Sequence, residues 1–178
     1  MKCGLRRRTG LAWLGAGLLA PWATRVTAAP ARGEAVAWPE GIRLLDGQPW
    51  TPRAGARKII VFWSTSCPYC RRHNRHVQAL QAQLAGRPLQ LLTVAREHDA
   101  DTVRRHLARE ALTLPVTLDH ARLAPALSER VFVPLTVTVG ADDRLEWVIP
   151  GEMTAEDVMA LADAPRPRPA PSTKGDSK

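Results

Sequence analysis

Two continuous apolar segments constrain the fold of this chain more strongly than any other feature of its sequence. They span residues 58–63 and 89–95, and both have the character of strands that are buried on both faces. Between them Val77, Leu80 and Leu84 recur at helical spacing, and the Gly-Arg-Pro sequence that follows ends the predicted helix. Strand, helix and strand in this order predict a partly parallel sheet.

The remaining segments continue this alternation of strands and helices. We expect further strands at residues 42–45, 48–51, 115–118, 135–139 and 144–148, of which the last two form a hairpin. Further helices are expected after Asp99 or Asp101, at residues 121–129 and after Thr154, the first with an apolar stripe of Val103, Leu107 and Ala111. The fold class is therefore α/β, with a central mixed sheet flanked by helices.

The formal net charge of +8 belongs to the two ends of the chain. Residues 1–28 and the tail from Pro165 hold the excess of Lys and Arg, whereas residues 29–164 contain sixteen basic and sixteen acidic residues. A neutral body does not provide the positive field that binds phosphate groups, so we expect no nucleic-acid partner.

The N-terminal residues are typical of an export signal. Basic residues at positions 2–8 precede an apolar run at 11–20, and small residues at 26–29 offer a cleavage site. We therefore expect residues 1–28 to be a signal peptide and the mature protein to be periplasmic. An uncleaved membrane anchor is the alternative, although the apolar run is short against the roughly 20 residues that span a bilayer.

The chain is thus expected to have four parts. A loose lead-in at residues 29–41 follows the signal of residues 1–28, one folded domain occupies residues 42–164, and residues 165–178 form a disordered Pro-rich tail. Because Cys3 leaves with the signal, the mature protein keeps two cysteines.

These two cysteines, Cys67 and Cys70, form a C-x-x-C pair that is too closely spaced for a disulfide between them to stabilise a fold. The common uses of such a pair are redox chemistry, zinc binding and haem attachment. Haem attachment requires a His directly after the second cysteine, where Arg71 stands. A structural zinc site requires four ligands, of which Cys67, Cys70 and His73 supply three, so we expect no metal.

Redox use fits the position of the pair, which lies between a buried strand and a helix beginning near Pro68. Cys67 is then at the helix N-terminus, where unpaired backbone N–H groups and the helix dipole stabilise a thiolate. Cys70 lies one turn along and is better buried. We expect Cys67 to exchange disulfides with a substrate and Cys70 to resolve the mixed disulfide, while Pro68 and Tyr69 help to set the potential.

The segment from Val61 to Cys70, Val-Phe-Trp-Ser-Thr-Ser-Cys-Pro-Tyr-Cys, resembles the active-site segment of thioredoxin-like proteins. More closely it resembles the periplasmic TlpA-like and ResA-like disulfide reductases, including those that serve cytochrome c maturation, over roughly residues 42–164. The resemblance implies a thioredoxin-like fold with an extra strand–helix segment before a cis-proline. We expect no cofactor.

By the same resemblance, Pro134 is the cis-proline of the family. It is then expected to lie against the dithiol and to let the backbone of Val133 pair with a substrate peptide. Val133, Pro134, Pro68 and Tyr69 therefore form the expected substrate-binding set. An ordinary trans proline at the start of a strand is the alternative.

Four positions depart from the pattern of the family. Ser66 replaces a Trp often found before the first cysteine, and Val61 stands where thioredoxin itself has a buried acid. His73 replaces the Glu usual in TlpA-like reductases, and it is either a proton-transfer residue near Cys70 or a solvated helix residue. Val133 is more typical of the oxidising DsbA-like proteins than of TlpA-like ones.

The leading hypothesis is an exported protein disulfide reductase that acts through a mixed disulfide. Its partners are substrate proteins bearing disulfides or thiols, together with a membrane thiol electron donor that restores the dithiol, and we expect a monomer. One alternative is a DsbA-like oxidase or isomerase, and glutaredoxin-like chemistry is another. The competing class is a non-enzymatic binding module in which the cysteines hold zinc or an inert disulfide.

Overall fold

The computed structural model describes residues 29–129 and 132–163. The predicted signal peptide and the predicted Pro-rich tail lie outside the described residues. Among the residues that are described, no helix has both the length and the apolar character needed to cross a membrane.

A five-stranded mixed sheet forms the centre of the domain, in the order β5-β4-β3-β6-β7. β4 pairs in parallel with β3 and β5, whereas β6 runs antiparallel to both β3 and β7. β1 and β2 form a separate small antiparallel sheet, and Leu44, directly after β1, forms a β-bridge with Thr117 of β5. The strands are β1 (Ile42–Arg43), β2 (Pro49–Trp50), β3 (Arg57–Trp63), β4 (Leu89–Ala95), β5 (Val116–Thr117), β6 (Leu135–Val139) and β7 (Leu145–Pro150). The predicted mixed sheet and hairpin are confirmed.

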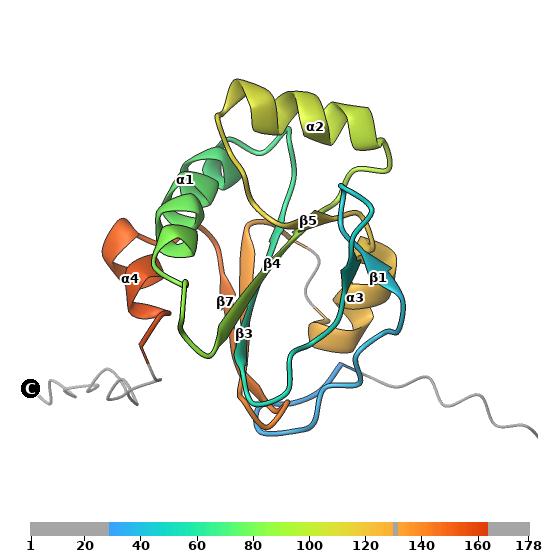
Figure 1. Cartoon of the computed structure of the whole chain (residues 1–178), viewed down its shortest axis with the longest axis vertical. Coiled ribbons are helices and arrows are strands. Elements are labelled where there is room, and N and C mark those ends of the chain that lie inside the picture. The colour runs from blue at the N-terminus through green and yellow to red at the C-terminus, as the bar shows by residue number, and fades with distance from the viewer. Residues whose placement is uncertain (1–28, 130–131, 164–178) are drawn as a thin grey trace, which may run out of the picture.

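The described residues form four helices: α1 (Pro68–Ala82), α2 (Ala100–Arg109), α3 (His120–Leu127) and α4 (Ala155–Ala160). In Figure 1, α1 and α4 lie side by side on one side of the sheet, and α3 lies on the opposite side near β1. β5 and α3 precede β6, which is the position expected for the strand–helix segment.

β3 is buried along its whole length and contributes to the core on both of its faces. Ile59, Val61 and Trp63 pack in one hydrophobic cluster with residues of α1, whereas Ile60 and Phe62 pack in a second cluster with residues of α3. This alternation follows from the twofold period of a strand. A hydrophobic residue at every position is therefore what a central strand covered on both sides requires.

Most helices begin directly after the capping residues that the sequence predicts. Asp99 caps α2 by accepting from the backbone N–H groups of Asp101 and Thr102, and Thr154 caps α4. The expectation that Ala111 belongs to the apolar stripe of α2 is wrong, because α2 ends at Arg109 and Ala111 is exposed with a φ of 53°.

The lead-in at residues 29–41 is docked on the sheet rather than loose. Ala35 forms a β-bridge with Arg144, and the backbone N–H of Leu145 donates to the carbonyl of Glu34 over 2.9 Å. Val36 is buried against the second cluster. Backbone hydrogen bonds thus hold this segment beside the start of β7.

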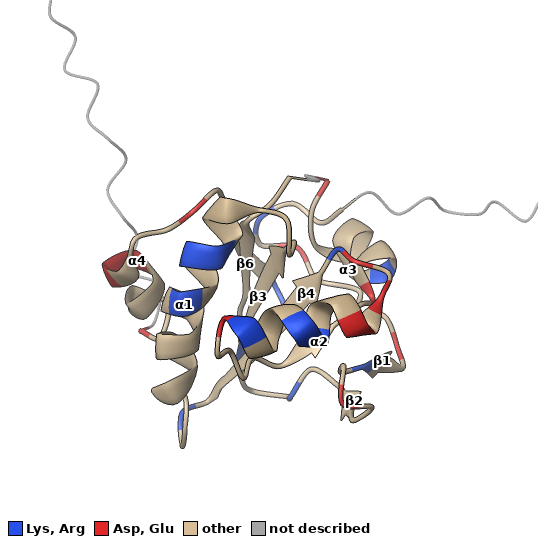
Figure 2. Cartoon of the chain, turned by 90° about the horizontal axis from the view of Figure 1, so that it is seen from above, with Lys and Arg blue, Asp and Glu red and all other residues tan. Residues whose placement is uncertain are grey.

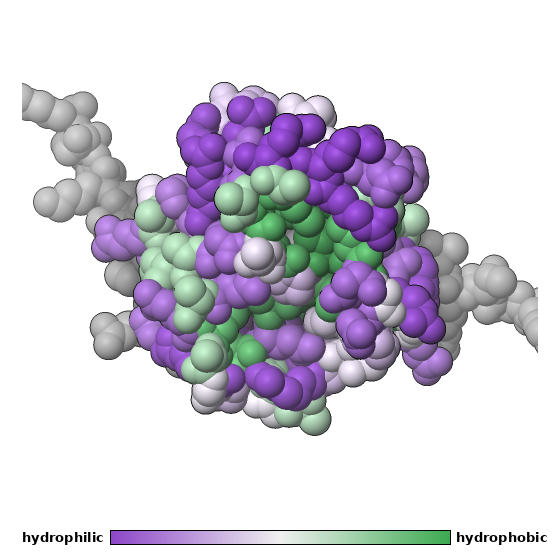
Figure 3. Space-filling model, turned by 45° about the horizontal axis from the view of Figure 1, so that its top comes forward, coloured by the Kyte–Doolittle hydropathy of each residue, from purple (hydrophilic) through white to green (hydrophobic). Residues whose placement is uncertain are grey.

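α1 and α2 carry charged residues along their length, which Figure 2 marks in blue and red from above. Many of them are paired: Glu110, directly after α2, binds Arg71 and Arg75 of α1 at 3.3 and 2.9 Å. Below the polar surface of α2, Figure 3 shows an apolar area. A groove there is lined by Leu44, Leu45, Leu107, Leu112 and Leu114, and neither cysteine of the dithiol lines it.

Candidate active site

The dithiol lies where β3 ends and α1 begins, as the sequence predicts. Cys67 is the N-cap of α1, with extended backbone angles, and Pro68 is in the first turn. The backbone N–H of Cys70 donates to the sulfur of Cys67 over 3.1 Å, so this sulfur takes the position of a capping oxygen. The start of a helix is where unpaired backbone N–H groups and the helix dipole favour an anion.

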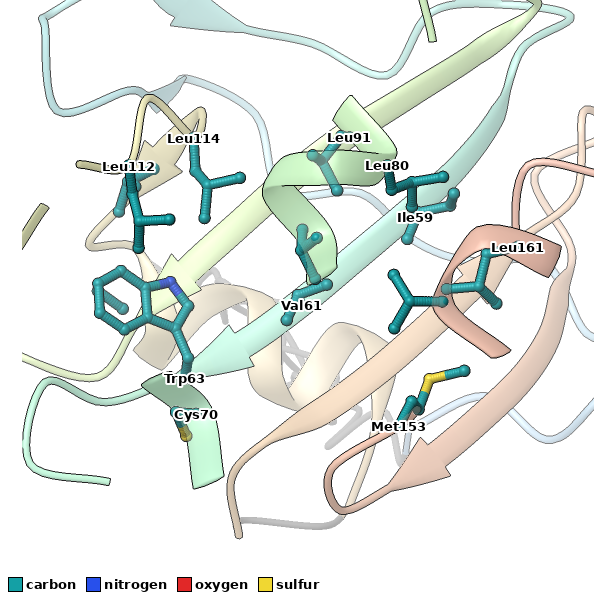
Figure 4. Close-up of a cluster of buried hydrophobic side chains, with 14 of the residues drawn as sticks. Ile59, Val61, Trp63, Cys70, Leu80, Leu91, Leu112, Leu114, Met153 and Leu161 are labelled. Atoms are coloured by element: carbon teal, nitrogen blue, oxygen red, sulfur yellow. The ribbon is translucent and has the colours of Figure 1, made fainter. Parts of the chain in front are cut away.

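The two sulfurs have different environments. Both cysteines are thiols; Cys67 is partly exposed, whereas Cys70 is fully buried beside Trp63 at the edge of the first core cluster (Figure 4). Burial is the main reason that the pKa of Cys70 rises to about 12, and the hydrogen bond with Cys67 and the negative charges of Cys67 and Glu97 add to the rise. One thiol is therefore accessible and the other is held protonated.

The peptide bond between Val133 and Pro134 is cis, so the cis prediction is confirmed and the trans alternative is wrong. Pro134 is buried, and the thiol of Cys67 points at the carbonyl oxygen of Val133 over 3.8 Å. The turn that precedes β6 thus lies against the dithiol, although the two segments are far apart in the sequence.

Two large hydrophobic side chains are exposed near this turn and the dithiol. Tyr69, within the dithiol motif, is 58% exposed, and Phe132, two residues before Pro134, is 47% exposed. Arg72 lies over the ring of Tyr69 at 5.0 Å and also forms two hydrogen bonds with Glu152. Sequence reasoning missed Phe132; the only signal was its closeness to the proline.

His73 is fully buried, so the solvated alternative is wrong. Its Nδ1 accepts from the backbone N–H of Met153 over 3.2 Å, which places the ring hydrogen on Nε2, 3.1 Å from Thr136 Oγ1. Burial lowers the pKa of His73 to about 4, helped by the charge of His76. Proton transfer by His73 stays a prediction, but with both ring nitrogens engaged the geometry favours a neutral residue that joins α1 to β6.

We expect this buried imidazole to make the fold sensitive to acid. The pKa of His73 is about 4 in the folded protein and 6.5 ordinarily. As pH falls, the unfolded chain therefore takes up the proton first. The free energy of unfolding is highest above pH 6.5 and decreases progressively towards pH 4. The loss is about 3 kcal/mol. His73→Gln should flatten this dependence in urea unfolding between pH 4 and 7, whereas His76→Gln should keep it; equal slopes in all three proteins would contradict the assignment.

Glu97, in the loop after β4, is a site residue that sequence reasoning left without a role. Its Oε1 accepts from the backbone N–H of Thr65 over 2.6 Å and from the hydroxyls of Thr65 and Ser64 over 2.9 and 2.8 Å. Burial would raise the pKa of Glu97, but these donors outweigh it and hold the pKa below its ordinary value. The only signal in the sequence was a carboxylate at the C-terminal end of a central strand.

The three residues considered for zinc do not form a ligand set. His73 uses its ring nitrogens for Met153 and Thr136, and the described part of the chain holds no group of three or more His, Cys, Asp or Glu side chains placed to hold a metal ion. The arrangement of Cys67 and Cys70 is instead that of an accessible thiol with a buried partner.

Comparisons with known proteins agree with this geometry. The thiol-disulfide oxidoreductase ResA of Halalkalibacterium halodurans is 25% identical over 114 residues, which are 64% of this chain and 64% of that protein. The chain therefore matches slightly less than two thirds of the length of this relative.

Solved structures share the fold. A thiol:disulfide interchange protein of the thioredoxin family from Chlorobium tepidum superposes with a TM-score of 0.63 at 21% identity, over 76% of this chain and 99% of that one. A secreted Mycobacterium tuberculosis disulfide oxidoreductase homologous to E. coli DsbE gives 0.56 at 15% identity, over 68% and 92%. The expected thioredoxin-like fold is confirmed.

The family follows from the sequence match. The family model described as Redoxin matches residues 42–164, which is most of the chain and includes both cysteines and the cis-proline. This chain belongs to the Redoxin family.

Proposed function

We propose that this protein is an exported thiol–disulfide oxidoreductase that reduces disulfides in other proteins through Cys67 and Cys70. The observation that carries the proposal is the difference between the two sulfurs: Cys67 is accessible at a helix N-terminus, and Cys70 is buried behind it with a raised pKa. A dithiol divided in this way suits a two-step exchange in which each sulfur has its own task.

In the first step the thiolate of Cys67 attacks one sulfur of a substrate disulfide, and the other substrate sulfur leaves as a thiolate that takes up a proton. In the second step Cys70 loses its proton and attacks Cys67, which releases the second substrate thiol and leaves a Cys67–Cys70 disulfide. The protein has then given two electrons to the substrate. The raised pKa of Cys70 keeps it protonated until the mixed disulfide has formed.

The surface around Cys67 supports a peptide substrate. Val133 and Pro134 bring backbone next to the reactive sulfur, and Pro68 and Tyr69 are exposed beside it. An extended substrate segment would pair with the backbone of Val133 and rest on the ring of Tyr69. Phe132 extends the same apolar surface.

The remaining parts of the proposal rest on the ends of the sequence and on relatives. The basic and apolar N-terminal segment supports export to the periplasm, and the related Mycobacterium tuberculosis protein is described as secreted. A protein acting there needs a membrane thiol donor to restore its dithiol, and cytochrome c maturation is one process that uses such reductases. We propose that the protein acts as a monomer.

The direction of electron flow is tested by the equilibrium between the purified protein and a thiol–disulfide buffer. We expect a reduction potential more negative than about −200 mV, which is the range of reductants. A potential near −120 mV, the value of a strong oxidant, would instead assign the protein to the oxidase class that Val133 suggests. The redox state is read by thiol alkylation and mass spectrometry.

A further inference from the structure

Glu97 is the described carboxylate that contacts the loop leading into the dithiol. β3 and β4 run in parallel, and the backbone N–H of Arg96 donates to the carbonyl of Trp63 over 3.0 Å. This hydrogen bond continues the pairing of β3 with β4 and places Glu97 beside residues 64–65. The three hydrogen bonds that its Oε1 accepts therefore come from the segment that connects β3 to Cys67.

The contacts continue from this loop to both cysteines. The carbonyl of Ser64 accepts from the backbone N–H of Cys67 over 3.3 Å, and the hydroxyls of Ser64 and Ser66 are 3.0 Å apart. The sulfur of Cys67 in turn accepts from the backbone N–H of Cys70 over 3.1 Å. Glu97 thus holds, through Ser64, the backbone on which the geometry of the dithiol depends.

The negative charge of Glu97 is not balanced by a salt bridge. Within residues 29–129 and 132–163, no Lys, Arg or His forms an ion pair with it, and its Oε2 is buried without a hydrogen-bond partner. Arg71 and Arg75, on the first turns of α1, pair with Glu110 instead. Because Glu97 is partly buried, its field at the dithiol is screened less than that of a fully exposed carboxylate.

We propose that Glu97 is a positioning residue that keeps the dithiol strongly reducing: its carboxylate holds the Ser64–Thr65 loop against Cys67 and Cys70, and its charge disfavours thiolates there. A thiolate can form only in the reduced protein, because the disulfide has no charge. A nearby negative charge therefore raises the free energy of the reduced form and favours transfer of its electrons, the reverse of a strong oxidant whose reduced form is stabilised. This inference rests on the proposed redox function.

The test uses Glu97→Gln in the full chain, because a glutamine keeps the shape and the accepting oxygen but lacks the charge. The measured equilibrium is the reaction of the protein dithiol with glutathione disulfide, which gives the protein disulfide and two molecules of reduced glutathione. We expect the equilibrium constant to shift about tenfold towards the reduced protein, which corresponds to about 30 mV. The pH at which Cys70 ionises should fall as well, since Glu97 contributes to its raised pKa.

Three further variants separate charge from structure. Glu97→Asp keeps the charge and should stay within about threefold of wild type. Glu97→Ala loses both the charge and the accepting oxygen and should shift at least as far as Glu97→Gln, so a result is obtained even if one of these variants does not fold. Glu34→Gln is the matched control, because Glu34 lies beside the start of the edge strand β7, whereas the dithiol follows the central strand β3. An unchanged constant in Glu97→Gln, an equal shift in Glu97→Asp, or an equal shift in Glu34→Gln would overturn the inference. An oxidising wild-type potential would instead overturn the proposed reductase direction.

Discussion

Cys67→Ser should lower the rate of disulfide reduction to that of buffer without protein, whereas Cys70→Ser should accumulate as a mixed disulfide with its substrate. The first result is expected because Cys67 is the accessible sulfur at the start of α1, and a hydroxyl does not replace a thiolate as nucleophile. The second is expected because the buried Cys70 supplies the only nearby thiol among the described residues that can release the substrate.

The measurement is non-reducing gel electrophoresis with mass spectrometry of trapped adducts, alongside a turnover assay with a protein disulfide. The double variant Cys67→Ser, Cys70→Ser should neither reduce the substrate nor form adducts. If Cys67→Ser formed stable adducts and Cys70→Ser formed none, the two roles would be reversed. Identifying the proteins trapped by Cys70→Ser in cells would also name the substrate.

Asp143→Asn is expected to cause the largest loss of stability. Lys58 in the central strand is fully buried, and its Nζ is 2.5 Å from Oδ1 of Asp143, which also accepts from the indole N–H of Trp38 over 3.0 Å. An asparagine keeps the accepting oxygen and tolerates the φ of 59° found at Asp143, but it leaves the ammonium of Lys58 buried without a countercharge. The expected cost is about 3 kcal/mol.

Urea unfolding at pH 7 measures this cost. Lys58→Met combined with Asp143→Asn removes both charges and should recover most of the lost stability, because the buried charge is then absent. Asp142→Asn, at the neighbouring exposed position, should leave the unfolding midpoint near that of wild type. A midpoint for Asp143→Asn equal to that for Asp142→Asn would show that the ion pair contributes little.

The elements that the sequence predicted well are those coded by local patterns. β4 begins and ends at the predicted residues, and Cys67, Asp99 and Thr154 cap helices as expected. Ala111 was placed wrongly because an apolar period does not reveal where a helix stops; that depends on backbone angles after Arg109.

The sequence predicted some residues of the site and not others. Cys67, Cys70 and Pro134 could be found because a close cysteine pair between a strand and a helix has few uses and a family resemblance identified the proline. His73 was ambiguous, because its neighbours along α1 are polar and suggested a solvated face, although α1 turns this residue towards Thr136 of β6. Glu97 could equally have been a residue of a polar loop.

The amino-acid sequence by itself determined the close cysteine pair, its place between strand and helix, and the α/β fold, because short-range spacing and hydrophobic period encode these features. The tertiary structure alone decided which groups surround the pair. The contacts of His73 with Thr136 and of Glu97 with Ser64 join residues 63 and 33 positions apart, and they form only when α1 packs on β6 and when β4 pairs with β3. The dithiol is thus a local motif, while the charge and burial that govern its chemistry come from the packed sheet and helices.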